Sequence, residues 1–168
     1  SETSTGLVQE SGSIKLTESD LTELFTGKSL NLSVSMGNRS KQVSLSKQNV
    51  SVSGIVPKVN SYTGRTSMEA ISFNSNVSLA INQKIYKNIS DSVGIKSVEL
   101  TDSLGRSVGL RNSSGNILSL HNDKLISELK MSDTVNRDGM HSYNLKVTNL
   151  VGGVTQKSFS FEVVNINR

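Results

Sequence analysis

Histidine and the acidic residues are the types that could hold a metal in this chain, and only the acidic residues are numerous. The two histidines, His121 and His141, each lie close in sequence to an aspartate, Asp123 and Asp138. Two imidazoles and a carboxylate can bind zinc. No H-E-x-x-H spacing is present, so we expect histidines that are solvated or hydrogen-bonded locally. We therefore predict no metal site.

Carboxylates at turns offer a second kind of cation chemistry. Asp91, Asp102, Asp123 and Asp138 all fall where a turn or loop is expected. Some immunoglobulin-like and cadherin-like modules bind calcium with loop carboxylates, but this sequence has no D-x-D-x-D cluster. A lone aspartate at a turn more often accepts hydrogen bonds from the backbone of that turn. We expect that structural role here.

A lysine, a glutamate and two asparagines occur in the order that an internal isopeptide bond would need. Lys15 lies in the first expected strand, Glu99 in mid-chain, and Asn165 and Asn167 in the last strand. This order resembles that of pilin-like domains, where a buried acid assists the bond. The reaction needs all three groups in an apolar core, because desolvation keeps the amine neutral and the acid protonated. Lys15 alternates with apolar neighbours, so we expect it to face solvent instead.

The sequence offers few residues for other kinds of catalysis. The chain has no cysteine, and none of its many serines stands in a G-x-S-x-G motif. With two separated histidines and no recognisable nucleophile motif, we predict no catalytic residue, no cofactor and no enzyme activity.

Two polar loops carry residue types that anchor interfaces. Tyr62 and Arg65 lie in the expected loop 60–67, and Arg111 begins the expected loop 111–116. Tyrosine and arginine are enriched at interface hot spots, so we take Tyr62, Arg65 and Arg111 as candidate partner-binding residues. The alternative is that both loops are solvated and the module is a spacer.

The elements that must position these residues are strands, and the clearest signal is the segment 138–163. Apolar and polar side chains alternate along both arms, which predicts an antiparallel hairpin with one buried face. Gly152 and Gly153 suit the reversal between the arms. The side chains expected to point inward are Tyr143, Leu145 and Val147 in the first arm and Phe159, Phe161 and Val163 in the second.

The residues Asp138-Gly139, Tyr143 and Leu145 resemble the tyrosine corner of immunoglobulin-like domains. Leu145 would take the position that antibody domains fill with cysteine. The tyrosine stands five positions after the aspartate, one more than in the usual D-x-G-x-Y spacing. With the upstream pattern VGIKSVELTDSLGRSV, the segment 77–168 is similar to the immunoglobulin-like modules of bacterial surface proteins and phage structural proteins. The resemblance implies an antiparallel β-sandwich and no specific activity.

Composition excludes several classes of protein. The net charge of +4 is spread evenly, and nucleic-acid binding would need a basic stripe with stacking aromatics. No apolar run reaches the roughly 18 to 20 residues that would insert into a membrane. Disorder is the competing interpretation of so polar a chain, but disorder predicts no alternation. The lack of disulfides favours a bacterial or phage origin over an animal secreted protein.

The chain is therefore predicted to be all-β: a flexible tail at 1–11, a smaller β-rich domain at 12–76, and an immunoglobulin-like antiparallel β-sandwich at 77–168. The segment 124–131 fits a strand or a short helix capped by Asn122, and we favour the strand.

The expected function is that of a non-enzymatic structural or adhesive module, exposed on a bacterial surface or in a phage particle. Its partner would be a protein or a glycan in a multi-subunit assembly or on a surface. Two alternatives are a fimbrial subunit assembled by donor-strand exchange and a carbohydrate-binding module.

Overall fold

The structure is a computed structural model that describes residues 15–62, 68–72 and 78–164. The chain divides into two compact units, Ser1–Val52 and Ser53–Arg168. The expected tail at 1–11 lies outside the described residues. So do Arg65, Asn165 and Asn167, while Lys15 is exposed as expected.

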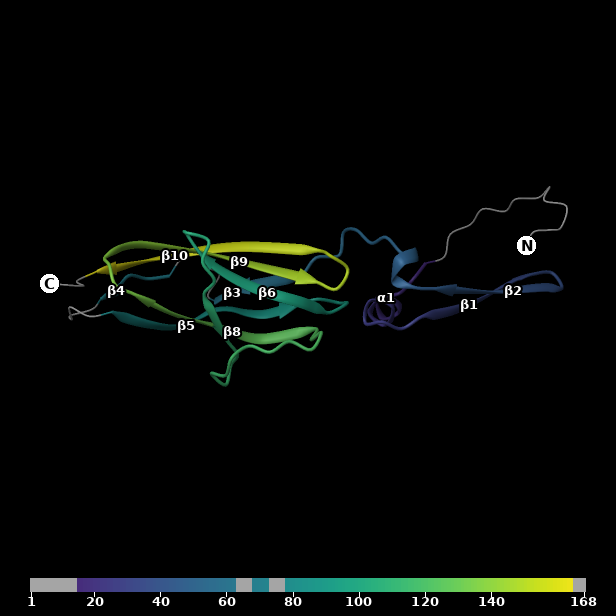
Figure 1. The fold of residues 1–168 in the computed structure, drawn as a ribbon, viewed down its shortest axis with the longest axis horizontal. Coiled ribbons are helices and arrows are strands. Elements are labelled where there is room, and N and C mark those ends of the chain that lie inside the picture. The colour runs from purple at the N-terminus through teal and green to yellow at the C-terminus, as the bar shows by residue number, and fades with distance from the viewer. Residues whose placement is uncertain (1–14, 63–67, 73–77, 165–168) are drawn as a thin grey trace. The chain divides into compact units, whose positions relative to one another are not determined.

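The described part of the first unit holds a helix and a β-hairpin (Figure 1). The helix α1 spans Glu18–Phe25 and begins with a capping box. The Thr17 hydroxyl accepts a hydrogen bond from the Asp20 amide at 3.1 Å, and the Asp20 carboxylate accepts one from the Thr17 amide at 2.9 Å. Leu21 and Leu24 form the buried side of this helix.

The hairpin consists of β1 (Leu30–Met36) and β2 (Arg39–Leu45), followed by the short 3-10 helix η1 (Lys47–Asn49). The two strands pair in a continuous antiparallel register from Leu30 opposite Leu45 to Met36 opposite Arg39. The apolar side chains of β1 share one face, but Val34 is 42% exposed and Met36 55% exposed. The hairpin was expected from its alternation. Leu30 and Leu32 are partly buried, whereas the end of the apolar face at Val34 and Met36 stays exposed.

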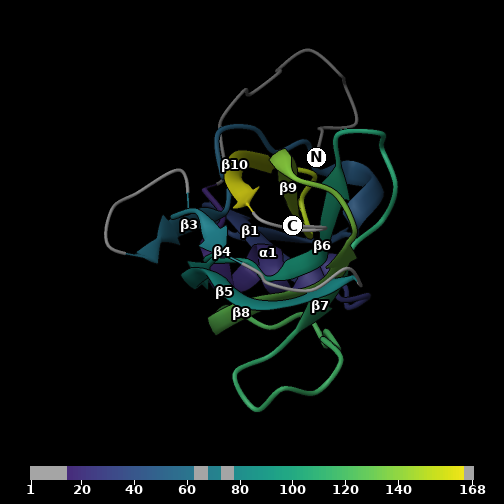
Figure 2. The same cartoon turned by 90° about the vertical axis from the view of Figure 1, so that its left-hand side faces the viewer.

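The second unit contains two four-stranded sheets, in the orders β3-β5-β8-β7 and β4-β10-β9-β6. Neighbouring strands are antiparallel except β4 and β10, which run parallel. Figure 2 shows β5 and β8 in one layer and β9 and β10 in the other. The described chain is therefore mostly β-strand, in agreement with the all-β prediction. The strand bounds are β3 Lys58–Ser61, β4 Ile71–Ser72, β5 Leu79–Ser90, β6 Ile95–Asp102, β7 Gly109–Arg111, β8 Leu125–Val135, β9 Gly139–Asn149 and β10 Val154–Val164.

One hydrophobic core lies between these two sheets and takes side chains from both. The six side chains predicted to point inward from β9 and β10 are all buried, and Leu145, Val147 and Val163 are fully so. The alternation of the hairpin is confirmed. The strand β8 also confirms the strand interpretation of 124–131. We expected Leu125 to point inward from this strand, but it is 58% exposed and its neighbour Ile126 is buried instead.

Tyr143 occupies the inner face of β9 and makes a specific polar contact. Its hydroxyl donates a hydrogen bond to Oδ2 of Asp133 on β8 at 2.8 Å, and its ring stacks on Phe159 with centroids 5.3 Å apart. Burial, followed by the interaction with Asp133, raises the pKa of Tyr143 well above its usual value. The contact ties the two sheets together through the core.

Asn149, at the end of β9, is fully buried and makes hydrogen bonds in three directions. Its Nδ2 donates to the Ile55 carbonyl at 3.0 Å and to Oδ1 of Asp91 at 2.9 Å. Its Oδ1 accepts from the amides of Val151 and Gly153 at 3.2 and 2.6 Å. A single side chain thus joins the start of the unit, the β5–β6 turn and the β9–β10 turn.

The second unit begins earlier than the sequence-based boundary between 76 and 77. Its first contacts come from residues before β3, since the Ile55 carbonyl binds Asn149 and the Pro57 carbonyl accepts from the Thr155 hydroxyl. Strand β3 then pairs with β5, and β4 pairs with β10. The amide of Met68 donates a hydrogen bond to the Ser160 carbonyl at 2.8 Å. Both short strands therefore belong to the sheets of the second unit, and the strands that they pair with come later in the chain.

The buried face of β9 can be tested by truncation. Replacing Leu145 with alanine should cost about 2 to 5 kcal/mol of unfolding free energy, because the side chain is fully enclosed. The adjacent Lys146→Ala should change stability by no more than about 0.5 kcal/mol, because Lys146 is exposed. Chemical denaturation of both variants measures the difference, and equal midpoints would contradict the assigned inner face.

The boundary can be tested with two fragments. The fragment 53–168 should unfold cooperatively by itself, because it retains all eight strands of the two sheets. The fragment 77–168 lacks β3, β4 and the Ile55 carbonyl, and it should be markedly less stable or fail to fold. Amide dispersion in NMR spectra and denaturant titration compare them. Equal stability of the two fragments would restore the later boundary.

Candidate functional site

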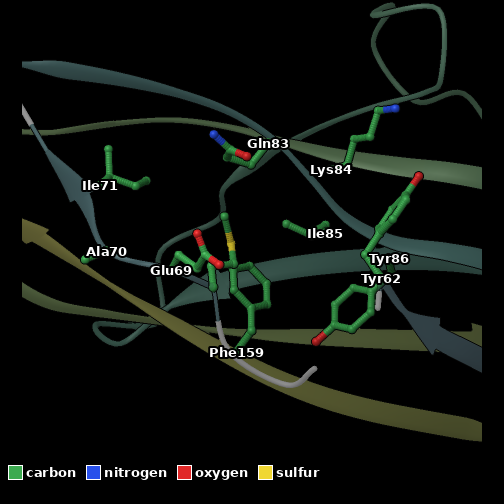
Figure 3. Close-up of a pocket in the computed structure, with 10 residues that line it drawn as sticks. Tyr62, Glu69, Ala70, Ile71, Gln83, Lys84, Ile85, Tyr86 and Phe159 are labelled. Carbon is green, nitrogen blue, oxygen red and sulfur yellow. The ribbon is translucent and has the colours of Figure 1, made fainter. Parts of the chain in front are cut away.

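Tyr62 lies directly after β3, beside a pocket of about 300 Å³. Met68, Gln83 and Phe159 also line the pocket, and Figure 3 shows Lys84 and Glu69 on opposite sides of it. It lies where β5 extends beyond the end of its neighbour β3.

Two lysines of β5 flank the ring of Tyr62. The Nζ atoms of Lys84 and Lys87 lie 6.0 and 5.4 Å from the ring centroid, within the range of cation–π attraction. Lys84 also forms an ion pair with Glu128 of β8 at 3.2 Å. Interaction with the Tyr62 hydroxyl and then with Lys84 lowers the pKa of Glu128. Tyr62 is therefore held among charged side chains.

Arg111, the second described candidate, ends β7 at the other edge of the same sheet. Its Nη1 donates to the Gly115 carbonyl at 3.1 Å, which closes the loop 111–116 over the guanidinium. Asn112 organises that loop, because its Oδ1 accepts hydrogen bonds from the amides of Ser114 and Asn116, both at 3.0 Å. The Nη1 group of Arg111 is thus already hydrogen-bonded within its own loop.

Tyr62 and Arg111 are joined by the side chains of the two central strands. Lys84 lies opposite Lys130, and Lys130 lies opposite Arg111 on the next strand. Directly opposite residues share a face of a sheet, so these three cations line up across the strands. Lys87 lies opposite Glu128, and the Lys84–Glu128 ion pair links this second pair to the row.

We call this surface the basic strip and define it by Tyr62, Lys84, Lys87, Arg111, Glu128 and Lys130. It contains four cations and one carboxylate, and it crosses the sheet from the β3 edge to the β7 edge. Three strand spacings separate the edges, or roughly 14 Å. The strip can offer an ordered row of positive charge with an aromatic ring at one end.

Sequence reasoning identified Tyr62 and Arg111 and missed the lysines between them. Lys84, Lys87 and Lys130 are far apart in sequence and form no charge run, so local charge patterning could not find them. The register between β5 and β8 brings them together.

Asp91 and Asp102 accept hydrogen bonds from the backbone of their own turns, as predicted for them. Oδ2 of Asp91 accepts from the amides of Val93 and Gly94, at 3.0 and 2.9 Å. Asp102 accepts from the amides of Leu104 and Arg106, both at 2.9 Å, and the bond from Arg106 is the main reason that the pKa of Asp102 is lowered. These carboxylates stabilise backbone turns.

The histidines lie apart from one another in the structure's described segments. His141 is buried, stacks on Phe161 and donates from Nε2 to the Arg137 carbonyl at 3.0 Å. His121 is exposed and approaches the Ser119 hydroxyl at 3.4 Å. No group of three His, Asp or Glu side chains suited to a metal ion occurs among the described residues.

The isopeptide arrangement cannot be assembled in full from the described residues, because both asparagines lie outside them. Glu99 is exposed and sits opposite Lys146 in the β6–β9 pair. Lys15 is also exposed. Neither group has the apolar surroundings that the reaction needs.

No model of a known protein family matches this chain, and the search of curated proteins also finds no match. No helix within the described residues is long and apolar enough to cross a membrane.

The tyrosines give the protein an expected response to alkaline pH. Burial raises the pKa of Tyr86 to about 12, and burial with the nearby Glu128 raises that of Tyr62 to about 12. The pKa of Tyr143, the remaining tyrosine, is raised as well. In the unfolded chain tyrosine ionises near pH 10, which is below the pKa values in the folded protein. Above pH 10 the unfolded state therefore releases protons more readily and is stabilised relative to the folded state as the pH rises.

The free energy of unfolding should therefore be unaffected by these groups below about pH 9 and should fall as the pH rises from about 10 to 12. Absorbance of tyrosinate near 295 nm, read beside denaturant midpoints, measures both effects. Three tyrosines that ionise near pH 10 in the folded protein would contradict the burial described for them.

Proposed function

We propose that this protein is a non-enzymatic adhesive or structural module of a bacterial surface protein or phage particle, built on an immunoglobulin-like β-sandwich. The strand order supports the fold proposal. The sheet β3-β5-β8-β7 follows the A-B-E-D order of immunoglobulin-like domains, and β6-β9-β10 follows C-F-G. The short β4, parallel to β10, extends the second sheet at its edge.

Details of β9 agree with the same proposal. In immunoglobulin-like domains a tyrosine near the start of strand F bonds back to an upstream segment, two residues before a buried position. Here Tyr143 bonds to Asp133, and Leu145 is fully buried. The acceptor is a side-chain carboxylate of β8, where the tyrosine corner usually uses a backbone group.

The observation that carries the functional proposal is the basic strip. Its cations are ordered by strand pairing and by contacts with Tyr62, Glu128 and the loop 111–116. A preformed row of charge with an aromatic ring favours a partner that carries clustered negative charge and offers some flat or apolar surface. Tyr62 is the single aromatic ring of the strip, whereas single-stranded nucleic acid is bound on a series of stacking rings. We therefore propose that the strip binds such a protein or glycan, and that the rest of the sandwich holds it in place.

Two alternatives have less support. A fimbrial subunit needs a donated strand, but among the described residues β9 already has β10 on one side, paired from Val154 to Val163, and β6 on the other. A carbohydrate-binding module usually presents a planar set of exposed aromatics. Tyr86, Tyr143, Phe159 and Phe161 are instead buried in the core.

The proposal is tested by retention on immobilised heparin, used as a probe with dense negative charge. The intact chain should elute at a higher salt concentration than the double variant Lys87→Glu with Lys130→Glu. The control is Lys96→Glu with Lys146→Glu, two exposed lysines on β6 and β9 of the other sheet, which changes the net charge equally. Circular dichroism checks that both variants fold.

The control should elute close to the intact chain, because only the strip variant loses an ordered set of charges. If the two double variants elute together, retention reports net charge alone. The strip would then have no binding role, and the module would be a spacer.

A further inference from the structure

The outer edge of β1 differs from every other described sheet edge. β1 pairs with β2 on one side, and no described strand pairs with it on the other. Exposed edges are templates for further pairing, and proteins usually guard them with charges, bulges or short strands. The strand β1 has the sequence LNLSVSM, with no charge and no proline, and its register with β2 has no irregularity.

The remaining edges of the described sheets carry such guards. β4 has two residues and β7 has three. β3 and β6 each have a register shift, and both carry lysine. β2 carries Arg39 and Lys41. β1 is therefore the exception among the sheet edges that the structure describes.

The side chains of β1 are arranged to fit a second copy of the same strand. Leu30, Leu32, Val34 and Met36 alternate with Asn31, Ser33 and Ser35, so the strand has one apolar and one polar face. In an antiparallel pair centred on Ser33, Leu30 of one copy lies opposite Met36 of the other, and Leu32 lies opposite Val34. Every apolar side chain then meets an apolar one on the same face.

We propose that two copies of this chain associate through β1, antiparallel about Ser33, to form a four-stranded sheet in the order β2-β1-β1-β2. The half-exposed Val34 and Met36 gain apolar neighbours in this sheet. A two-stranded hairpin needs further strands or a packed helix to be stable in water, and pairing through β1 adds two strands to this one. The pairing is isologous, so it closes at a dimer.

Charge decides between pairing through β1 and pairing through β2. Arg39 and Lys41 lie on β2, which is the outer strand of the proposed sheet. The two β2 strands are then separated by three spacings, about 14 Å, which exceeds the screening length of about 8 to 10 Å at physiological salt. Pairing through β2 about Gln42 would instead make the two Lys41 side chains diagonal neighbours, which is unfavourable.

A cysteine crosslink in the full chain tests both the contact and its register. The chain has no cysteine of its own, so Ser33→Cys introduces a single thiol on an exposed position. In the proposed pair the two thiols lie directly opposite one another. Under mild oxidation Ser33→Cys should form a disulfide dimer at least about tenfold faster than Ser35→Cys, since pairing raises the effective concentration of adjacent thiols.

Ser35→Cys is the matched control, because it lies on the same face and strand and is also exposed. Its thiol would face Asn31 of the other copy and stay far from its own equivalent. Equal crosslinking rates for the two variants would overturn the proposed register.

Light scattering of the unmodified chain over a range of concentrations gives the second measurement. The average mass should rise towards twice the chain mass, and Val34→Lys should remain at one chain mass. The control is Val154→Lys in the second unit, because Val154 is 39% exposed and Val34 is 42% exposed. A chain that stays monomeric at every concentration, or a Val34→Lys chain that still dimerises, would overturn the proposal.

Discussion

The second unit depends on one buried side chain, Asn149, and on the three parts of the chain that it connects. An amide group without solvent must satisfy its donors and acceptor within the protein, since each unpaired group costs about 1 to 3 kcal/mol. Asn149 does so by binding the Ile55 carbonyl, the Asp91 carboxylate and two amides of its own turn. Asp91 is itself occupied by the amides of the β5–β6 turn. Removing the Asp91 carboxylate or moving the Ile55 carbonyl away would leave one N–H of the Asn149 amide buried without an acceptor.

Close packing strengthens this constraint. A Cβ atom on Gly153 would collide with the Ile55 carbonyl and with the side chain of Asn149. The segment before β3 therefore lies directly against the β9–β10 turn, and it can do so only if that turn carries glycine. This is the physical reason that the second unit starts near residue 53.

Sequence reasoning succeeded where structure follows from local alternation. The inner faces of β9 and β10, the position of Tyr143 and the turn at Gly152 all depend on residues close together in the chain, and the structure has them as predicted. It failed at the boundary between the units, because β3 and β4 are too short to show a period and gain their place from distant partners.

The basic strip was only half visible in the sequence, for a related reason. Tyr62 and Arg111 stand out as residue types, but their connection runs through the β5–β8 register, which includes a shift between Lys84 and Tyr86. No simple count along the strands would align Lys84 with Lys130 and Lys87 with Glu128. In both units the informative side chains lie on sheet faces and edges, so strand pairing decides which of them act together.

Native-state hydrogen exchange of the full chain tests the role of Asn149 most directly. The amides of Val93, Gly94 and Gly153, all held by Asn149 or Asp91, should exchange only through global unfolding of the second unit, as the central amides of β9 do. Their opening free energies should match those of β9 and fall equally in denaturant. Turn amides that exchange by a local opening, well below the global free energy, would show that Asn149 does not hold the unit together.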